Sequence, residues 1–76
     1  MLTREISGYF MNVTINGAAH EVADGTTVAQ AVRTLTTATT GVAVAVNDEV
    51  VTRSTWETTV LGDSDRMEVL TAVQGG

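Results

Sequence analysis

The segment that decides the fold is RMEVLTAVQGG, residues 66–76. Apolar and polar residues alternate along its first part, which predicts a β-strand with one buried face. One face of this strand would carry Met67, Val69, Thr71 and Val73, and the other Arg66, Glu68, Leu70 and Ala72. Because no other stretch alternates as densely, we expect this strand to lie at the centre of a sheet.

The segment ends in two glycines, Gly75 and Gly76. A residue without a side chain cannot anchor to a core and has the largest backbone freedom. We therefore expect Gly75 and Gly76 to protrude and to end in a free carboxylate. Such a tail could enter a narrow slot in another protein, which makes the Gly76 carboxylate the candidate reactive group. The alternative is a frayed terminus without a function.

The composition excludes several classes of protein. A chain of 76 residues forms one domain. It has no cysteine, which excludes disulfides, thiolate metal sites and a thioester held on the chain itself. The net charge is −5 and all four basic residues are arginines, so we expect no nucleic-acid binding and a basic partner surface instead. Since no apolar run approaches the ~18 residues of a membrane span and residues 1–10 lack a secretory pattern, we expect no membrane association and a cytoplasmic location.

The order of predicted elements begins with a hairpin. We expect residues 1–10 to be a flexible extension, residues 11–74 to form the folded domain and residues 75–76 to protrude. Met11–Asn16 and Ala18–Val22 are predicted strands, and Asn16-Gly17 between them indicates a type I′ turn. His20 is the single histidine, and without further ligands at a suitable spacing it predicts no metal site; we expect it to face solvent.

The middle of the chain predicts one helix and two more strands. Thr26 and Thr27 are candidate helix caps, and a helix would then place one apolar face toward the core, made of Val28, Ala31, Val32 and Leu35. In the strand of residues 42–46 the valines would face the core, leaving Ala43 and Ala45 on the opposite face. A short strand at 50–51 and a helical turn at 54–57 follow, with Trp56 partly buried. Asp63 and Asp65 indicate a turn in preference to a calcium site.

The pattern resembles a known architecture through motifs whose order and spacing carry the likeness: MNVTING (11–17), DGTTV (24–28), VAVN (44–47), EVV (49–51) with Arg53, Ser54 and Trp56, then Asp63, Asp65 and VQGG (73–76). It resembles the α+β ubiquitin-like β-grasp, a mixed sheet of four or five strands with one helix packed across it. More narrowly, it is similar to the ThiS family, the sulfur carrier proteins of thiamine (thiazole) biosynthesis. Thr52 stands where this family often has proline, and Ser64 where it often has glycine.

The resemblance implies a mechanism. A ThiF-like adenylating enzyme would use ATP and magnesium to convert the Gly76 carboxylate into an acyl-adenylate. A sulfurtransferase or cysteine desulfurase would then supply sulfur, giving a thiocarboxylate that thiazole synthase consumes. The tail Val73, Gln74, Gly75 and Gly76 would enter the partner active sites. The chain itself would be a co-substrate rather than an enzyme, without a bound cofactor or metal and monomeric when free.

The outer face of the sheet is the predicted partner-binding surface. If the last strand neighbours the strand 42–46, Leu70 projects beside Ala43 and Ala45, with Glu68 at the rim and Ala72 further along. An ordinary half-exposed sheet is the alternative. Three other functions stay open: sulfur delivery to molybdopterin, cysteine or tRNA thiolation, a β-grasp interaction module whose glycines are incidental, and conjugation to target proteins.

Overall fold

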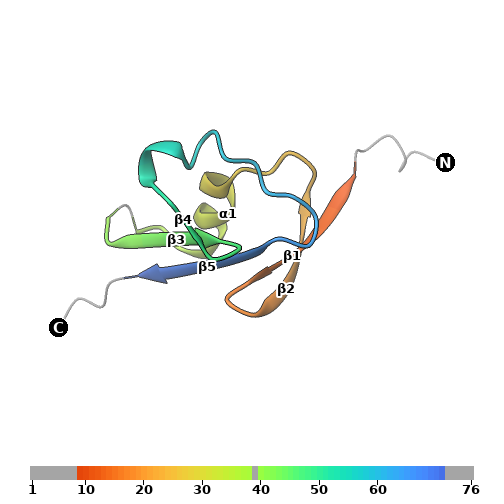
Figure 1. Ribbon diagram of the computed structural model, residues 1–76, viewed down its shortest axis with the longest axis horizontal. Coiled ribbons are helices and arrows are strands. Elements are labelled where there is room, and N and C mark those ends of the chain that lie inside the picture. Colours follow the sequence, from red (N-terminus) through yellow and green to blue (C-terminus); the bar gives the residue numbers. More distant parts are fainter. Residues whose placement is uncertain (1–8, 39, 72–76) are drawn as a thin grey trace.

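The chain folds as a five-stranded mixed sheet with one helix on one face (Figure 1). The computed structural model describes residues 9–38 and 40–71. The elements along the chain are β1 (Phe10–Ile15), β2 (Ala18–Ala23), α1 (Val28–Leu35), β3 (Val42–Val46), β4 (Glu49–Val51), a 3₁₀ turn (Arg53–Thr55) and β5 (Arg66–Thr71). The strand order β2-β1-β5-β3-β4 confirms the predicted β-grasp and the central position of β5.

The sheet is mixed because β5 runs parallel to β1 and antiparallel to β3. The core lies between the sheet and α1 and is formed by Met11, Val13, Ile15, Val28, Ala29, Ala31, Val32, Val44, Trp56, Leu61, Met67 and Val69. Every inward residue predicted for β1 is buried. Among the described residues, α1 covers one face of the sheet and no other helix or strand covers the opposite face (Figure 1).

The start of α1 is fixed by a capping box. The Thr27 hydroxyl accepts a hydrogen bond from the Gln30 amide at 3.2 Å, and the Gln30 side chain accepts one from the Thr27 amide at 2.9 Å, which confirms the predicted cap. The next two helix amides donate to the carbonyls of Thr59 and Trp56 at 2.8 and 3.1 Å. These two bonds satisfy amides that a helix leaves without partners, and they attach the segment after the 3₁₀ turn to the helix.

Two hairpin turns have the same backbone geometry. Asn16 and Gly17 have φ angles of +52° and +83°, and Asn47 and Asp48 have +52° and +72°. Positive φ at both central positions is the type I′ arrangement that suits the twist of the strands. The prediction for Asn16-Gly17 is therefore confirmed, and the turn between β3 and β4 proves to be of the same type.

Several predictions were wrong in detail. β1 begins at Phe10, which pairs with Ala23, because β2 extends far enough to pair with it; Phe10 therefore belongs to the sheet and not to the predicted extension. Leu35 is 41% exposed, since it is the last residue of α1 and the chain leaves the helix in an extended conformation at Thr36. Trp56 is only 6% exposed, so it is a core residue rather than a partly buried one.

The ends of the predicted domain lie outside the described residues. This applies to residues 1–8 of the predicted extension, and to the tail. Within residues 9–38 and 40–71, no helix is long and apolar enough to cross a membrane.

Candidate functional site

The outer face of β5 and β3 brings the predicted surface residues together. Met67 and Val69 point into the core and are 1% and 7% exposed, whereas Leu70 is 69% exposed. Leu70 lies opposite Ala43 and Glu68 lies opposite Ala45 in the antiparallel pair of β5 with β3. Directly opposite residues share a face of the sheet, so the predicted neighbourhood of Leu70 and the two alanines is confirmed.

Val50 enlarges this surface and was not predicted from the sequence. It lies opposite Ala45 in the pairing of β3 with β4, hence on the same face, and it is 77% exposed. We call the group Ala43, Ala45, Val50 and Leu70 the sheet patch. Two adjacent valines in a three-residue strand give no alternation, so the sequence could not indicate which of Val50 and Val51 faces outward.

The sheet patch continues into a hollow at the end of β5. The hollow has a volume of about 460 Å³ and is lined by Gly41, Val42, Ala43, Leu70 and Thr71. Thr71 is the last described residue, so the hollow lies where β5 leads into the predicted tail. The predicted site residues Ala72, Val73, Gln74, Gly75 and Gly76 are themselves outside the described residues.

Charged side chains border the start of β5. The Arg66 guanidinium binds the Asp48 carboxylate, with Nη2 and Oδ2 3.0 Å apart. This hydrogen bond, together with the positive charge of Arg66, holds the pKa of Asp48 below its ordinary value and raises the pKa of Arg66. Both side chains are exposed, and an exposed pair contributes little to stability. Glu68, predicted at the rim, is exposed beside Ala45.

The backbone of β5 is held on its β1 side by the side chain of Asn16. The parallel register pairs Ile15 with Met67, but the chain then leaves the sheet in the Asn16-Gly17 turn. The side-chain carboxamide of Asn16 replaces the next residue of β1 as the partner of β5. Its Nδ2 donates to the Val69 carbonyl at 3.1 Å, and its Oδ1 accepts from the Val69 amide at 2.8 Å. A carboxamide has the same donor and acceptor as a peptide group, so it extends the ladder along β5.

The Asn47 side chain holds the start of β5 on the β3 side. Its Oδ1 accepts from the Arg66 amide at 3.0 Å, and its Nδ2 donates to the Asp65 carboxylate at 2.9 Å. Its own backbone amide donates to the Arg66 carbonyl at 2.7 Å. The two turn asparagines therefore fix the strand that leads to the tail from both of its neighbours.

The described residues contain no metal-binding cluster. Within residues 9–38 and 40–71, no group of three or more histidine, cysteine or acidic side chains is arranged to hold a metal ion. His20 is exposed on β2, and β1 separates that strand from β5. The residues that line the hollow at the end of β5 are Gly41, Val42, Ala43, Leu70 and Thr71, which are all uncharged.

The strand order, the single covering helix and the central strand that leads to the C-terminus define the class of the ubiquitin-like β-grasp proteins. The model of the ThiS family matches residues 13–76, which is most of the chain. The chain therefore belongs to the ThiS family.

A solved structure agrees with this assignment. The crystal structure is that of the thiamine biosynthesis protein (ThiS) from Geobacter metallireducens, whose sequence is 33% identical to this one. The match covers 87% of this chain and 100% of that chain, with a TM-score of 0.71. No curated protein matches the sequence.

Proposed function

We propose that this chain is the sulfur carrier of thiazole formation in thiamine biosynthesis. The observation that carries the proposal is the match to the ThiS family, which runs to residue 76 and so includes Gly75 and Gly76. The likeness to a thiamine biosynthesis protein over the whole of that chain supports the same pathway. The proteins of this family are small sulfur carriers. In the proposed function, this chain is a substrate of its partner enzymes.

The proposed chemistry takes place at the Gly76 carboxylate. A carboxylate is a poor electrophile because it has no good leaving group. A ThiF-like adenylating enzyme with ATP and magnesium converts it to an acyl-adenylate and releases pyrophosphate. The terminal sulfur of a persulfide on a sulfurtransferase or cysteine desulfurase then attacks the carbonyl carbon, and AMP leaves. A thiol reduces the resulting acyl disulfide, which breaks its S–S bond, forms a new disulfide on the donor side and releases the thiocarboxylate. Thiazole synthase takes this sulfur into the ring and returns the carboxylate. The proposal sets this exchange in the cytoplasm.

The folded body supplies recognition in this proposal. The sheet patch and the adjacent hollow lie where β5 leads into the tail. A partner that binds the patch would therefore receive the tail at a defined position, since β5 is fixed by Asn16 and Asn47. Correct placement matters because reacting atoms must approach within about 3–3.5 Å. Exposed apolar side chains surrounded by polar ones are typical of such contact surfaces.

The test is thiocarboxylate formation, followed by mass spectrometry. The full chain is incubated with an adenylating enzyme of the same family, ATP, magnesium and a sulfur source. A gain of about 16 Da, the mass difference between sulfur and oxygen, is expected at the C-terminus. No gain would favour the interaction module whose glycines are incidental. Which synthase then consumes the sulfur separates the thiazole pathway from molybdopterin, cysteine or tRNA thiolation.

A chain lacking Gly76 is the matched control. The deletion shortens the reach by about 3.5 Å, which exceeds the tolerance of a reacting pair, so turnover with thiazole synthase should vanish. The melting temperature should not change, because the deletion removes no side chain. If the shortened chain still delivered sulfur, the Gly76 carboxylate would not be the reacting group.

A further inference from the structure

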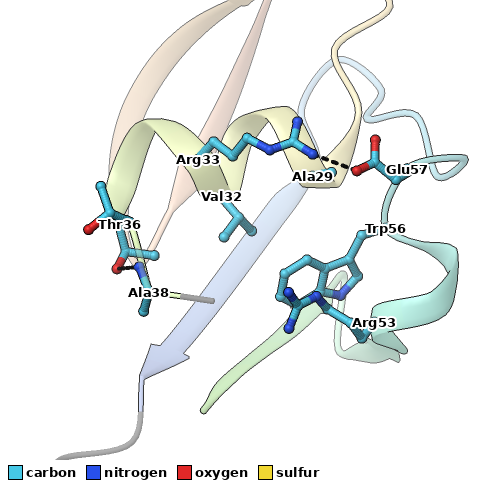
Figure 2. A pocket seen from close by; sticks show the side chains of 9 residues that line it. Ala29, Val32, Arg33, Thr36, Ala38, Arg53, Trp56 and Glu57 are labelled. Atoms are coloured by element: carbon cyan, nitrogen blue, oxygen red, sulfur yellow. Dashed lines mark hydrogen bonds and ion pairs between the residues drawn. The ribbon is translucent and has the colours of Figure 1, made fainter. Parts of the chain in front are cut away.

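A second hollow lies on the helix side of the molecule, between the end of α1 and the 3₁₀ turn (Figure 2). Its volume is about 410 Å³ and its lining consists of Ala29, Val32, Arg33, Thr36, Thr37, Ala38, Arg53, Trp56 and Glu57. A cavity of this size is in the range that holds a ligand or a large side chain. Nothing in the proposed sulfur chemistry uses it. We call it the helix pocket.

The base of the helix pocket is apolar and buried. Ala29, Val32 and Trp56 are 3%, 3% and 6% exposed. The one polar group of the indole, Nε1, already donates to the Val51 carbonyl at 2.9 Å, and the Trp56 carbonyl accepts from the Ala29 amide at 3.1 Å. The base therefore offers apolar surface without a polar atom that could orient a small ligand.

The rim of the helix pocket carries positive charge. The guanidinium carbon of Arg53 lies 4.7 Å from the centroid of the Trp56 ring, and Arg33 binds Glu57 at the opposite side (Figure 2). Within residues 9–38 and 40–71, no acidic side chain forms an ion pair with Arg53. The side chains at the rim therefore carry two positive charges and one negative charge, although the net charge of the whole protein is −5. A local positive site on an acidic protein attracts a negatively charged partner.

We propose that the helix pocket docks an acidic segment of a partner protein, which inserts one apolar side chain beside Trp56 and places a carboxylate on Arg53. The position of the charges favours a peptide over a small ligand. Arg33 is 62% exposed along its side chain and Arg53 is exposed, so both meet groups that lie outside the hollow. A chain crossing the rim with one side chain in the pocket satisfies both features.

This inference rests on the proposed function in one respect: it takes the chain to work by binding other proteins. The helix pocket is built from α1 and the 3₁₀ turn, whereas the sheet patch lies on the face of the sheet opposite α1. The two surfaces can therefore be occupied together. One partner could hold the carrier at the helix pocket while another works at the tail.

Trp56 is the single tryptophan of the chain, so its fluorescence reports on the helix pocket directly. The probe is an acetylated and amidated peptide with one phenylalanine between pairs of aspartates, added to the isolated full chain. We expect a saturable spectral change with a Kd on the order of 1 mM. Amide chemical shifts should change in residues 29–38 and 53–57. The same peptide with lysines replacing the aspartates should bind at least fivefold more weakly, as should a peptide with alanine replacing the phenylalanine.

Matched variants distinguish binding at the helix pocket from nonspecific attraction between charges. Arg53→Gln should weaken binding about fivefold, the effect of one unit-charge contact at about 4 Å in water. Arg66→Gln removes the same charge from the start of β5 and should leave the Kd within about twofold, since Arg66 does not line the helix pocket and pairs with Asp48. Leu70→Glu should likewise have no effect, because it alters the other face.

Any one of several results would overturn the inference. These include no saturable change, equal binding of the lysine peptide or of the alanine peptide, equal losses for Arg53→Gln and Arg66→Gln, and shift changes centred on the sheet patch. Free 3-phenylpropionate binding as tightly as the peptide would also overturn it, in favour of a small-molecule site. Because the titration needs no adenylating enzyme, its failure leaves the 16 Da test of the carrier function untouched, and the reverse also holds.

Discussion

The two hydrogen bonds between the Asn16 side chain and the Val69 backbone give the sharpest prediction about stability. The variant is Asn16→Gly, because glycine adopts a φ of +52° without strain, so that the change removes the side chain and adds only the entropy cost of glycine. The lost bonds have lengths of 3.1 and 2.8 Å and are partly buried. Each net hydrogen bond contributes about 0.5–1.5 kcal/mol, so we expect the free energy of unfolding to fall by about 2 kcal/mol.

Two further variants divide this loss into its parts. Asn16→Ala removes the same bonds and adds the cost of a left-handed backbone at a residue with a Cβ, about 1–2 kcal/mol, so its loss should be the largest. Asn16→Asp keeps the acceptor for the Val69 amide but places a carboxylate oxygen against the Val69 carbonyl. It should therefore be less stable than the wild type above the pKa of the new carboxyl group, and should recover partly when that group is protonated and can donate.

Urea denaturation of the full chain measures these differences, and hydrogen exchange at the Val69 amide localises them. We expect the loss of protection at Val69 to exceed that at Val44, which the variant does not touch. If Asn16→Gly stayed within about 0.5 kcal/mol of the wild type, the net value of the two bonds would be below the usual range. The account of Asn16 as a substitute for a residue of β1 would then be refuted.

Three other changes test separate features of the structure. Ser64 has a φ of +72°, so Ser64→Gly should raise stability by about 0.5 kcal/mol, because relief of 1–2 kcal/mol of backbone strain exceeds the entropy cost of glycine; thermal unfolding measures this, and a lower melting temperature would contradict it. Leu70→Glu and Val50→Glu should each weaken binding of an adenylating enzyme at least tenfold, about 1.4 kcal/mol, without changing the melting temperature; unchanged affinity in calorimetry would remove that residue from the contact surface. Arg66→Gln should raise the pKa of Asp48 toward its ordinary value in an NMR titration, and an unchanged pKa would contradict the cause given above. Since the pKa of Asp48 is lowered in the fold, the stability it contributes is present above the unfolded pKa and is lost as the pH falls through the folded pKa.

The features that follow from neighbouring residues could be predicted from the sequence. Alternation identified β5 and its two faces, and the Asn-Gly pair identified the first turn. The helix cap was predicted from Thr27. Each of these depends on residues within a few positions of one another, where the geometry of a strand, turn or helix start sets the spacing.

Features that join distant residues could not be predicted in the same way. The hydrogen bond from the Val69 amide to the Asn16 side chain spans 53 positions, and no local pattern distinguishes an asparagine that only forms a turn from one that also pairs with another strand. The depth of Trp56 depends on how residues 56–59 attach to the start of α1. The exposure of Val50 depends on the register of β4 against β3. In each case the deciding information is a tertiary pairing.

Asn16 and Asn47 each form part of a turn and also bind another segment of the chain, which limits how this scaffold can be redesigned. Replacing either loop by an idealised Asp-Gly hairpin would satisfy the local turn, but it would remove the side-chain N–H that donates to Val69 or to Asp65. In a saturation-mutagenesis library, positions 16 and 47 should therefore accept fewer amino acids than other loop sites. A designer who transplants these hairpins onto a different protein should carry the receiving strand along with them.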